Sequence, residues 1–146
     1  MHTWDIVGIT LQVDPMFNQS IQTNMFPDSC VKLAFDYEFN QIIAEDVLPK
    51  GLIRLTLAGF FNQPISPRVL PNSLTHLIFG DYFNRPIAAD VLPKQLTHLS
   101  FGDNFNQPIE HGVLPTSLTH LNLGRWFDSP IMDCPHGLTL TYDEGH

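Results

Sequence analysis

The sequence predicts a right-handed β-solenoid of about six coils, with one short parallel strand per 22-residue coil and little helix. The first observation is a unit, FNQPI or a variant, that recurs at a constant interval of 22 residues. Its copies begin at Phe17, Phe39, Phe61, Phe83, Phe105 and Phe127. A Leu-Pro pair and a Leu-x-Phe/Leu unit keep the same period. Such a period is typical of coils that bury their apolar side chains only against neighbouring coils.

The Leu-x-Phe/Leu unit predicts the strand of each coil, because its apolar residues alternate with polar ones. Its copies are Leu33–Phe35, Leu55–Leu57, Leu77–Phe79, Leu99–Phe101 and Leu121–Leu123. In the middle copy we expect Leu77 and Phe79 to point inward and His76 and Ile78 outward. Residues 11–13 lie one period upstream and are the predicted first strand. Residues 138–140 are a candidate last strand, with Asp143 at the next core position.

The segment that runs from FNQPI to the next Leu-Pro pair is predicted to be extended. We call it the return leg, because it leads the chain back toward the next strand. It holds two prolines in most copies, as at 64 and 71, and proline disfavours helix. Cys30 takes the place of the leucines at 52, 74, 96 and 118, so it is expected to be buried. The whole chain, 1–146, reads as one repeat domain, with an N-terminal edge over 1–9, repeats over 10–131 and a C-terminal end over 132–146.

Composition excludes several classes of function. The net charge of −8 argues against nucleic acid, because phosphate contacts need clustered Lys and Arg. No stretch approaches the roughly 20 apolar residues of a membrane span, so no membrane partner is expected. The N-terminal sequence does not resemble a signal peptide, and the two cysteines, Cys30 and Cys134, match no metal or disulfide pattern. These features predict a cytoplasmic, reducing location.

Residues 70–87, LPNSLTHLIFGDYFNRPI, and their counterparts resemble the FNIP-repeat family, a leucine-rich-repeat variant of social amoebae and giant viruses. The resemblance covers about residues 10–131. It implies a leucine-rich-repeat-like solenoid and a scaffold or interaction role. Members often join such repeats to an F-box that recruits ubiquitin-ligase machinery; because this sequence begins within a repeat, we expect no F-box in it. Asn84 follows later than in the usual leucine-rich pattern, so a standard asparagine ladder does not follow from the resemblance.

One column of asparagines nevertheless predicts a structural ladder. Its members are Asn18, Asn40, Asn62, Asn84 and Asn106. An asparagine side chain both accepts and donates hydrogen bonds, so stacked copies can satisfy backbone groups at a bend. Asn18 also starts a glycosylation sequon, Asn18-Gln19-Ser20, and its place in the column favours the structural interpretation. The threonines at 75, 97, 119 and 141 predict a second, cross-strand hydroxyl ladder.

The outward strand face holds the candidate partner-binding residues. One column reads Lys32, Arg54, His76, His98 and His120, and the next includes Thr56, Ile78, Ser100 and Asn122. Aromatic residues follow at the rim, where Tyr82 and Trp126 are candidate anchors for a partner. Phe60 shares their column, and the alternative for such residues is packing beneath the bend. The histidine column could also be a duplicated surface residue without a role.

Histidine is a common metal ligand, so the column could hold zinc. Parallel stacking, however, points the three imidazoles side by side, whereas zinc prefers ligands that converge tetrahedrally. We therefore predict no metal site and no cofactor. No Ser or Cys lies in a recognisable nucleophilic setting and no glycine-rich phosphate loop is present, which argues against an enzyme.

The interpretation favoured by the sequence is a protein-interaction module or scaffold that binds an unidentified protein through the outward strand face. The first alternative is a self-assembling structural protein. Solenoids usually carry polar caps, yet the N-terminal edge offers Trp4, Ile6, Val7 and Ile9, which favours end-to-end self-association. A module that binds a metal or a small ligand is the second alternative.

Overall fold

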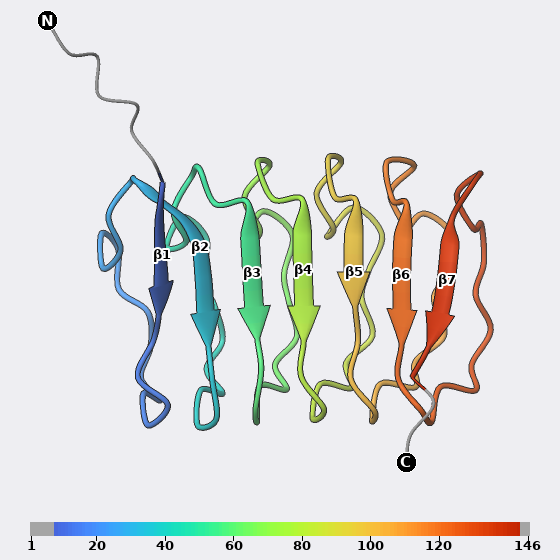
Figure 1. The fold of residues 1–146 in the computed structure, drawn as a ribbon, viewed down its shortest axis with the longest axis horizontal. Helices are drawn as coiled ribbons and strands as arrows, with labels where there is room; N and C mark the ends of the chain where they lie inside the picture. Colours follow the sequence, from blue (N-terminus) through green and yellow to red (C-terminus); the bar gives the residue numbers. More distant parts are fainter. Residues whose placement is uncertain (1–7, 144–146) are drawn as a thin grey trace, which may run out of the picture.

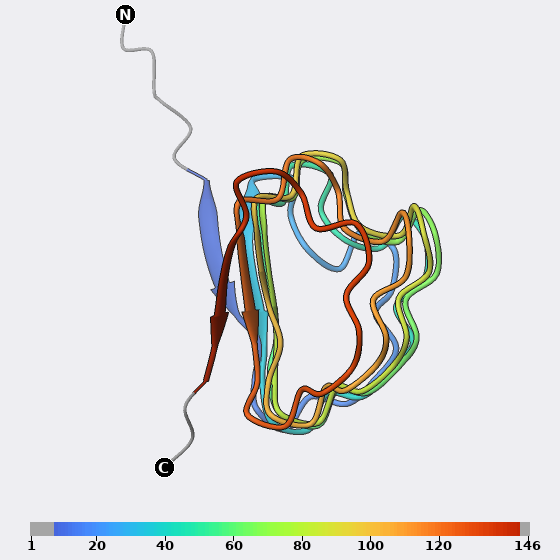
Figure 2. The same ribbon diagram turned by 90° about the vertical axis from the view of Figure 1, so that its right-hand side faces the viewer.

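The computed structural model describes residues 8–143, and this part of the chain is a single β-solenoid. Its strands are β1 (Ile9–Gln12), β2 (Cys30–Phe35), β3 (Arg54–Leu57), β4 (His76–Phe79), β5 (His98–Ser100), β6 (His120–Leu123) and β7 (Thr139–Tyr142). They form one parallel seven-stranded sheet in sequence order (Figure 1). The strands lie nearest the viewer and point downward while the chain advances to the right, so the coils are right-handed (Figures 1 and 2).

The strands pair in the register that the 22-residue period predicts. Leu55 pairs with Leu33 on one side and Leu77 on the other, and Leu77 pairs with Leu99. From β3 to β6 the inward residues are buried and the residues between them are at least partly exposed. The predicted inward and outward sides of the strands are therefore confirmed.

Phenylalanine side chains fill the space between the sheet and the return legs. The FNQPI phenylalanines stack coil on coil, with ring centroids 5.9 Å apart for Phe39 and Phe61 and 6.1 Å for Phe61 and Phe83. Phe79, at the end of β4, stacks on Phe83 at 3.9 Å and thereby joins the sheet to the return leg. Cys30 is completely buried, as predicted. This continuous apolar core is the main source of stability, because no coil can bury its side chains alone.

The return legs contain turns and no helix. At four Leu-Pro turns, the N–H of the third residue after the proline bonds to the proline carbonyl, as in Leu74 N–H to Pro71 O at 3.1 Å, and the same bond forms at Pro27 and Pro135. One residue just before each Val-Leu-Pro segment has a positive φ, for example Asp46 at 63°, Asp90 at 64° and Gly112 at 77°. Asp, Asn and Gly adopt this left-handed conformation at least cost. No helix in residues 8–143 is long and apolar enough to cross a membrane.

The last coil departs from the predicted register. Leu121 pairs with Leu140, 19 residues later, and Thr141 lies opposite Asn122. The expectation that Thr141 continues the threonine ladder is therefore wrong, as is the placement of Asp143 at the next core position. Residues CPHGL, 134–138, repeat the turn of LPTSL, 114–118, after only 20 residues. Figure 2 shows the shortened return leg, in red, running inside the others.

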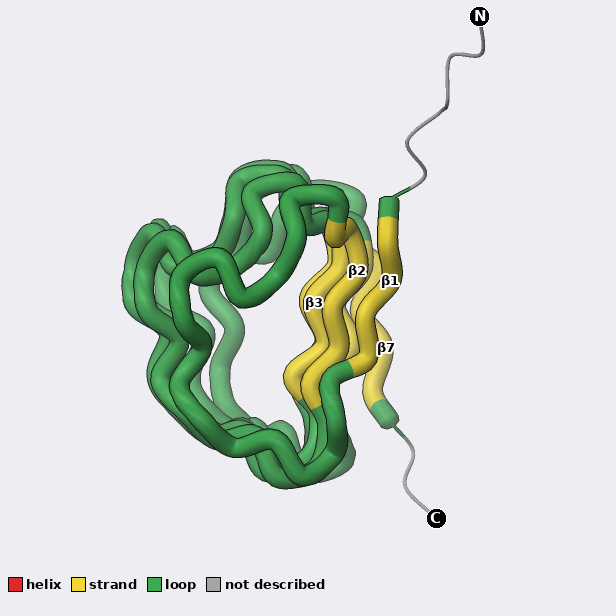
Figure 3. Tube along the Cα trace, turned by 90° about the vertical axis from the view of Figure 1, so that its left-hand side faces the viewer, coloured by secondary structure: helices red, strands yellow, loops and turns green. Residues whose placement is uncertain are grey.

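The two ends of the sheet are uncovered in the described part of the chain. β1 is exposed or partly exposed along its length and β7 is exposed throughout (Figure 3). Of the residues predicted to mediate self-association, Ile9 lies in β1 and is 40% exposed. Trp4, Ile6 and Val7 lie outside the described residues.

Candidate functional site

The predicted outward column is assembled as one straight row across five strands. Lys32 pairs with Arg54, Arg54 with His76, His76 with His98, and His98 with His120. We call these five residues the basic column. It extends from β2 to β6 on the exposed side of the sheet, and Thr139 of β7 lies beyond its last member.

The three imidazoles of the basic column stack face to face. Ring centroids are 4.1 Å apart for His76 and His98, with an interplanar angle of 9°, and 4.4 Å apart for His98 and His120, with an angle of 6°. Each ring also contacts the threonine that precedes it: Oγ1 and Nδ1 are 2.9 Å apart at residues 75 and 76, and 2.8 Å at 97 and 98 and at 119 and 120. The rings are thus fixed by the threonine contact at Nδ1 and by stacking against the neighbouring rings.

The threonine hydroxyls connect the imidazoles to the backbone of the preceding coil. Thr97 Oγ1 lies 3.1 Å from the carbonyl oxygen of Thr75, and Thr119 Oγ1 lies 3.0 Å from that of Thr97. Each hydroxyl also contacts Nδ1 of the ring that follows it, so Nε2 points away from this contact. The cross-strand threonine ladder therefore runs from hydroxyl to backbone carbonyl.

Both environment and neighbours favour neutral imidazoles. The pKa of His76 is lowered from 6.5 first by burial and then by the charges of His98, Arg54, Lys32 and His120. The pKa of His98 is lowered by burial, by His120 and by Arg54. Stacked parallel rings direct their nitrogens along the same line rather than toward a shared point, so they do not provide the convergent geometry that zinc requires. Within residues 8–143, no group of three His, Cys, Asp or Glu side chains is arranged around a metal position.

A shallow groove of about 260 Å³ runs beside the histidines over β4 to β7. The second predicted column forms its floor, and Thr141 closes it at β7. Its residues are Arg54, His76, Leu77, Ile78, His98, Leu99, Ser100, His120, Leu121, Asn122 and Thr141. Asn122 donates to Ser100 Oγ at 3.2 Å and accepts from Thr141 Oγ1 at 2.8 Å. Thr56 lies outside the groove, next to Ile78 in the same column.

The rim aromatics are exposed, so packing beneath the bend is excluded for them. Tyr82 is 52% and Trp126 61% exposed. Tyr82 lies edge-on to Phe60, with centroids 4.8 Å apart, and Phe60 contacts Tyr37 in the same way. Trp126 stands four coils from Tyr37, with the Arg125 guanidinium 5.5 Å above its ring. Three aromatics thus form a cluster at the rim of β2 to β4, and Tyr37 is a member that the sequence did not indicate.

The asparagine column forms a ladder on the return legs, remote from the strand face. Each Oδ1 accepts the backbone N–H of the next rung at 2.9 Å, from Asn18 to Asn106, and Asp128 N–H closes the series at 2.8 Å. A glutamine that follows one rung donates to the asparagine of the preceding coil, as Gln63 does to Asn40 Oδ1 at 3.1 Å. The side chains are occupied by backbone groups, which fits a structural role.

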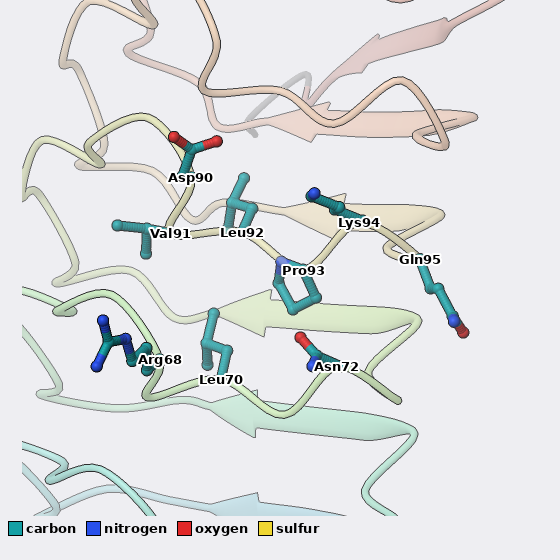
Figure 4. A pocket seen from close by; sticks show the side chains of 9 residues that line it. All are labelled: Arg68, Leu70, Asn72, Asp90, Val91, Leu92, Pro93, Lys94 and Gln95. Atoms are coloured by element: carbon teal, nitrogen blue, oxygen red, sulfur yellow. The ribbon is translucent and has the colours of Figure 1, made fainter.

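A second hollow, of about 430 Å³, lies between the Leu-Pro turns of two return legs (Figure 4). Arg68, Asp90 and Lys94 line it, with Leu70 and Leu92 between them. Similar hollows recur one coil earlier and one coil later, around Asp46 and around Gly112. A cavity that repeats with the coil is a consequence of the scaffold, so we do not take it as a specific site.

Glycines recur at 80, 102 and 124, one period apart and just beyond the strands. A Cβ atom added to Gly102 or Gly124 would lie less than 3 Å from the backbone of the preceding coil. Glycine is required at these positions because adjacent backbones approach closely there. The recurrence of glycine just after the strand was the sequence feature from which this close approach could have been predicted.

Comparison with known proteins identifies the repeat. The FNIP Repeat family model matches residues 17–60, 61–104, 83–126 and 105–133. Among solved structures, the chain is similar to CroV588, described as a novel circular LRR protein, with 50% sequence identity and a TM-score of 0.88. The match covers 92% of this chain and 20% of the other, so this chain spans about a fifth of that protein's length. No curated protein matches. On the fold, the repeat motifs and these matches, the chain belongs to the FNIP-repeat family.

Proposed function

We propose that the chain is a protein-interaction module that binds its partner through the outward face of β2 to β6. The observation that carries the proposal is the groove beside the histidines, whose lining includes a column of outward residues that differ from coil to coil. Ile78, Ser100 and Asn122 occupy equivalent positions in successive strands and offer three different chemistries. Stacking requires none of these differences, because the core on the other side of the strands is nearly constant.

The rim supports the same proposal. Exposed aromatic side chains are frequent anchors at protein interfaces because they bury a large area at little entropic cost. Tyr82 lies three residues beyond the end of β4 and so borders the face that carries the groove. A partner lying across the strands would contact the basic column and the groove together, with Tyr82 or Trp126 at its margin.

The test is partner capture with matched variants. The face variant replaces Arg54, His76, His98 and His120 with alanine. The control variant replaces Arg68, Lys94 and Glu110, exposed residues of the return legs, with alanine. A partner retained by the wild type and the control but lost by the folded face variant supports the proposal. Retention of the same partner by the face variant contradicts it.

Self-assembly is the second candidate, favoured by the uncovered sheet edges at β1 and β7. A further solenoid could add a strand there by parallel pairing. The asparagine ladder fits this less well. If β1 of a second copy paired with β7, its Asn18 would lie two coils from Asp128, the last rung of the first copy. A sedimentation coefficient that rises with concentration would favour self-assembly, whereas a constant value would disfavour it.

Binding of a metal or small ligand receives the least support, because the imidazoles do not converge. We propose no catalytic role and no cofactor for the chain. The location in a reducing compartment stays a prediction that fits two free thiols, one of them, Cys134, exposed.

A further inference from the structure

The basic column brings together two permanent cations and three titratable rings. Lys32 and Arg54 stand on β2 and β3, and the stacked imidazoles of His76, His98 and His120 continue the row on β4, β5 and β6. Thr139, the neighbour of His120 on β7, is uncharged. The charged groups that influence His76 are Lys32, Arg54 and the other two histidines, all of one sign.

Asp143 contacts the second column rather than the basic one, because its Oδ1 accepts a hydrogen bond from the Asn122 amide at 3.3 Å. The ion pair described between His111 and Asp133 lies on the return legs. Within residues 8–143, therefore, no carboxylate is paired with the basic column.

Protonation changes what this column can bind. A protonated imidazole carries a proton on both nitrogens, so Nδ1 donates to the threonine and Nε2, which points away from that contact, becomes a second donor. The row then carries more positive charge than Lys32 and Arg54 supply. Cations stacked at 4.1 and 4.4 Å repel one another, and an anionic ligand laid along the row would relieve that repulsion.

We propose that the basic column is a pH-gated binding site for an acidic peptide segment of a partner protein, which binds more tightly when the imidazoles of His76 and His98 become protonated. This rests on the proposed interaction function and specifies its partner chemistry and its regulation. The row has the charge complementary to carboxylates, and adjacent members lie one strand spacing apart, about 4.8 Å, within reach of successive acidic side chains. A peptide fits better than a nucleic acid, because phosphate contacts need clustered Lys and Arg and this row holds one of each.

The pH dependence has a definite sign. The lowered pKa values of His76 and His98 keep both rings neutral at pH 7.5. As the pH falls below 6.5, protonation adds charge, and a bound carboxylate raises the pKa of the ring beside it. Binding of the acidic segment and uptake of protons therefore favour each other, and affinity rises as the pH falls.

The test measures binding of a fluorescent oligo-glutamate peptide at pH 7.5 and pH 5.5. Two new exposed ion pairs predict an increase in affinity of about fivefold. The increase should vanish in the variant H76Q/H98Q/H120Q, whose side chains remain neutral at both pH values. It should persist in His111→Gln, the control for a histidine outside the basic column. Arg54→Gln should weaken binding at both pH values.

Several outcomes would overturn the proposal. They are an equal increase in the triple glutamine variant, absence of binding at both pH values, equal binding of oligo-glutamine, and equal binding of a single-stranded oligonucleotide. The partner-capture experiment distinguishes a failure of the pH gating from a failure of the proposed interaction function. A partner captured through the face with no pH-dependent binding of oligo-glutamate refutes the gating alone, whereas a partner captured equally by the face variant refutes the interaction function itself.

Discussion

The two sides of the sheet differ in how much their residues change from coil to coil. On the inward side, leucine recurs in five successive strands, at 33, 55, 77, 99 and 121, and each is at most 2% exposed. On the outward side, the column from Ala34 to Asn122 holds a different residue in every strand. The inward residues are constrained by core packing, while those of this outward column are not. We propose on this basis that stability depends on the inward side of the strands and recognition on the outward side. Substitutions at neighbouring residues of one strand test this division.

The largest contrast is expected within β4. Leu77→Ala removes a completely buried side chain between Leu55 and Leu99 and should lower the free energy of unfolding by about 3 kcal/mol. Ile78→Ala, one residue along and on the outward side, should cost less than about 1 kcal/mol. Chemical denaturation of both variants measures the difference, and equal losses would show that the two sides do not divide as described.

A smaller effect is expected where the coils approach most closely. Gly102→Ala places a Cβ less than 3 Å from the Gly80 backbone and should destabilise the protein by about 2 kcal/mol, since backbone cannot move as a flexible side chain can. Gly51→Ala is the control, because the nearest atom to its added Cβ is 3.8 Å away. Thermal unfolding of the two variants would refute the close-approach role of Gly102 if their midpoints were equal.

The asparagine ladder should contribute about 1 to 2 kcal/mol per rung. Asn62→Ala leaves the partly buried N–H of Asn84 without its acceptor. Asn104→Ala removes an exposed asparagine outside the ladder and should change little. Hydrogen exchange at the amide of residue 84 gives an independent reading, with faster exchange expected only in Asn62→Ala. Unchanged exchange in Asn62→Ala would show that the ladder does not contribute to stability.

The smallest effect concerns pH. Since the pKa values of His76 and His98 lie below 6.5 in the folded state, the unfolded chain takes up protons first as the pH falls. Their contribution to stability is complete above about pH 6.5 and is lost as the pH falls through 6.5 toward the folded values. H76Q/H98Q/H120Q should therefore lose less stability than the wild type between pH 7.5 and 5.5. An identical dependence in both proteins would exclude the stacked rings as its source.

The sequence alone was sufficient to predict the coil, the register of β2 to β6 and the side to which each strand residue points. A strict period is consistent with only one such arrangement. It was not sufficient for the last coil. There the 22-residue period was extended to Thr141, although CPHGL already marked an early turn. The stacking of the imidazoles and the threonine contacts that orient them also depend on χ angles, which spacing does not determine. The role of Gly102 became visible only with the distance between coils.

The central claim, that recognition resides on the outward face and is separable from stability, is tested most directly by one paired measurement. It determines the free energy of unfolding and the partner capture of the variant with alanine at 54, 76, 98 and 120. The account predicts a free energy within about 1 kcal/mol of the wild type, because these side chains are outside the core, together with loss of the captured partner. Retained capture, or a variant that fails to fold, would contradict it.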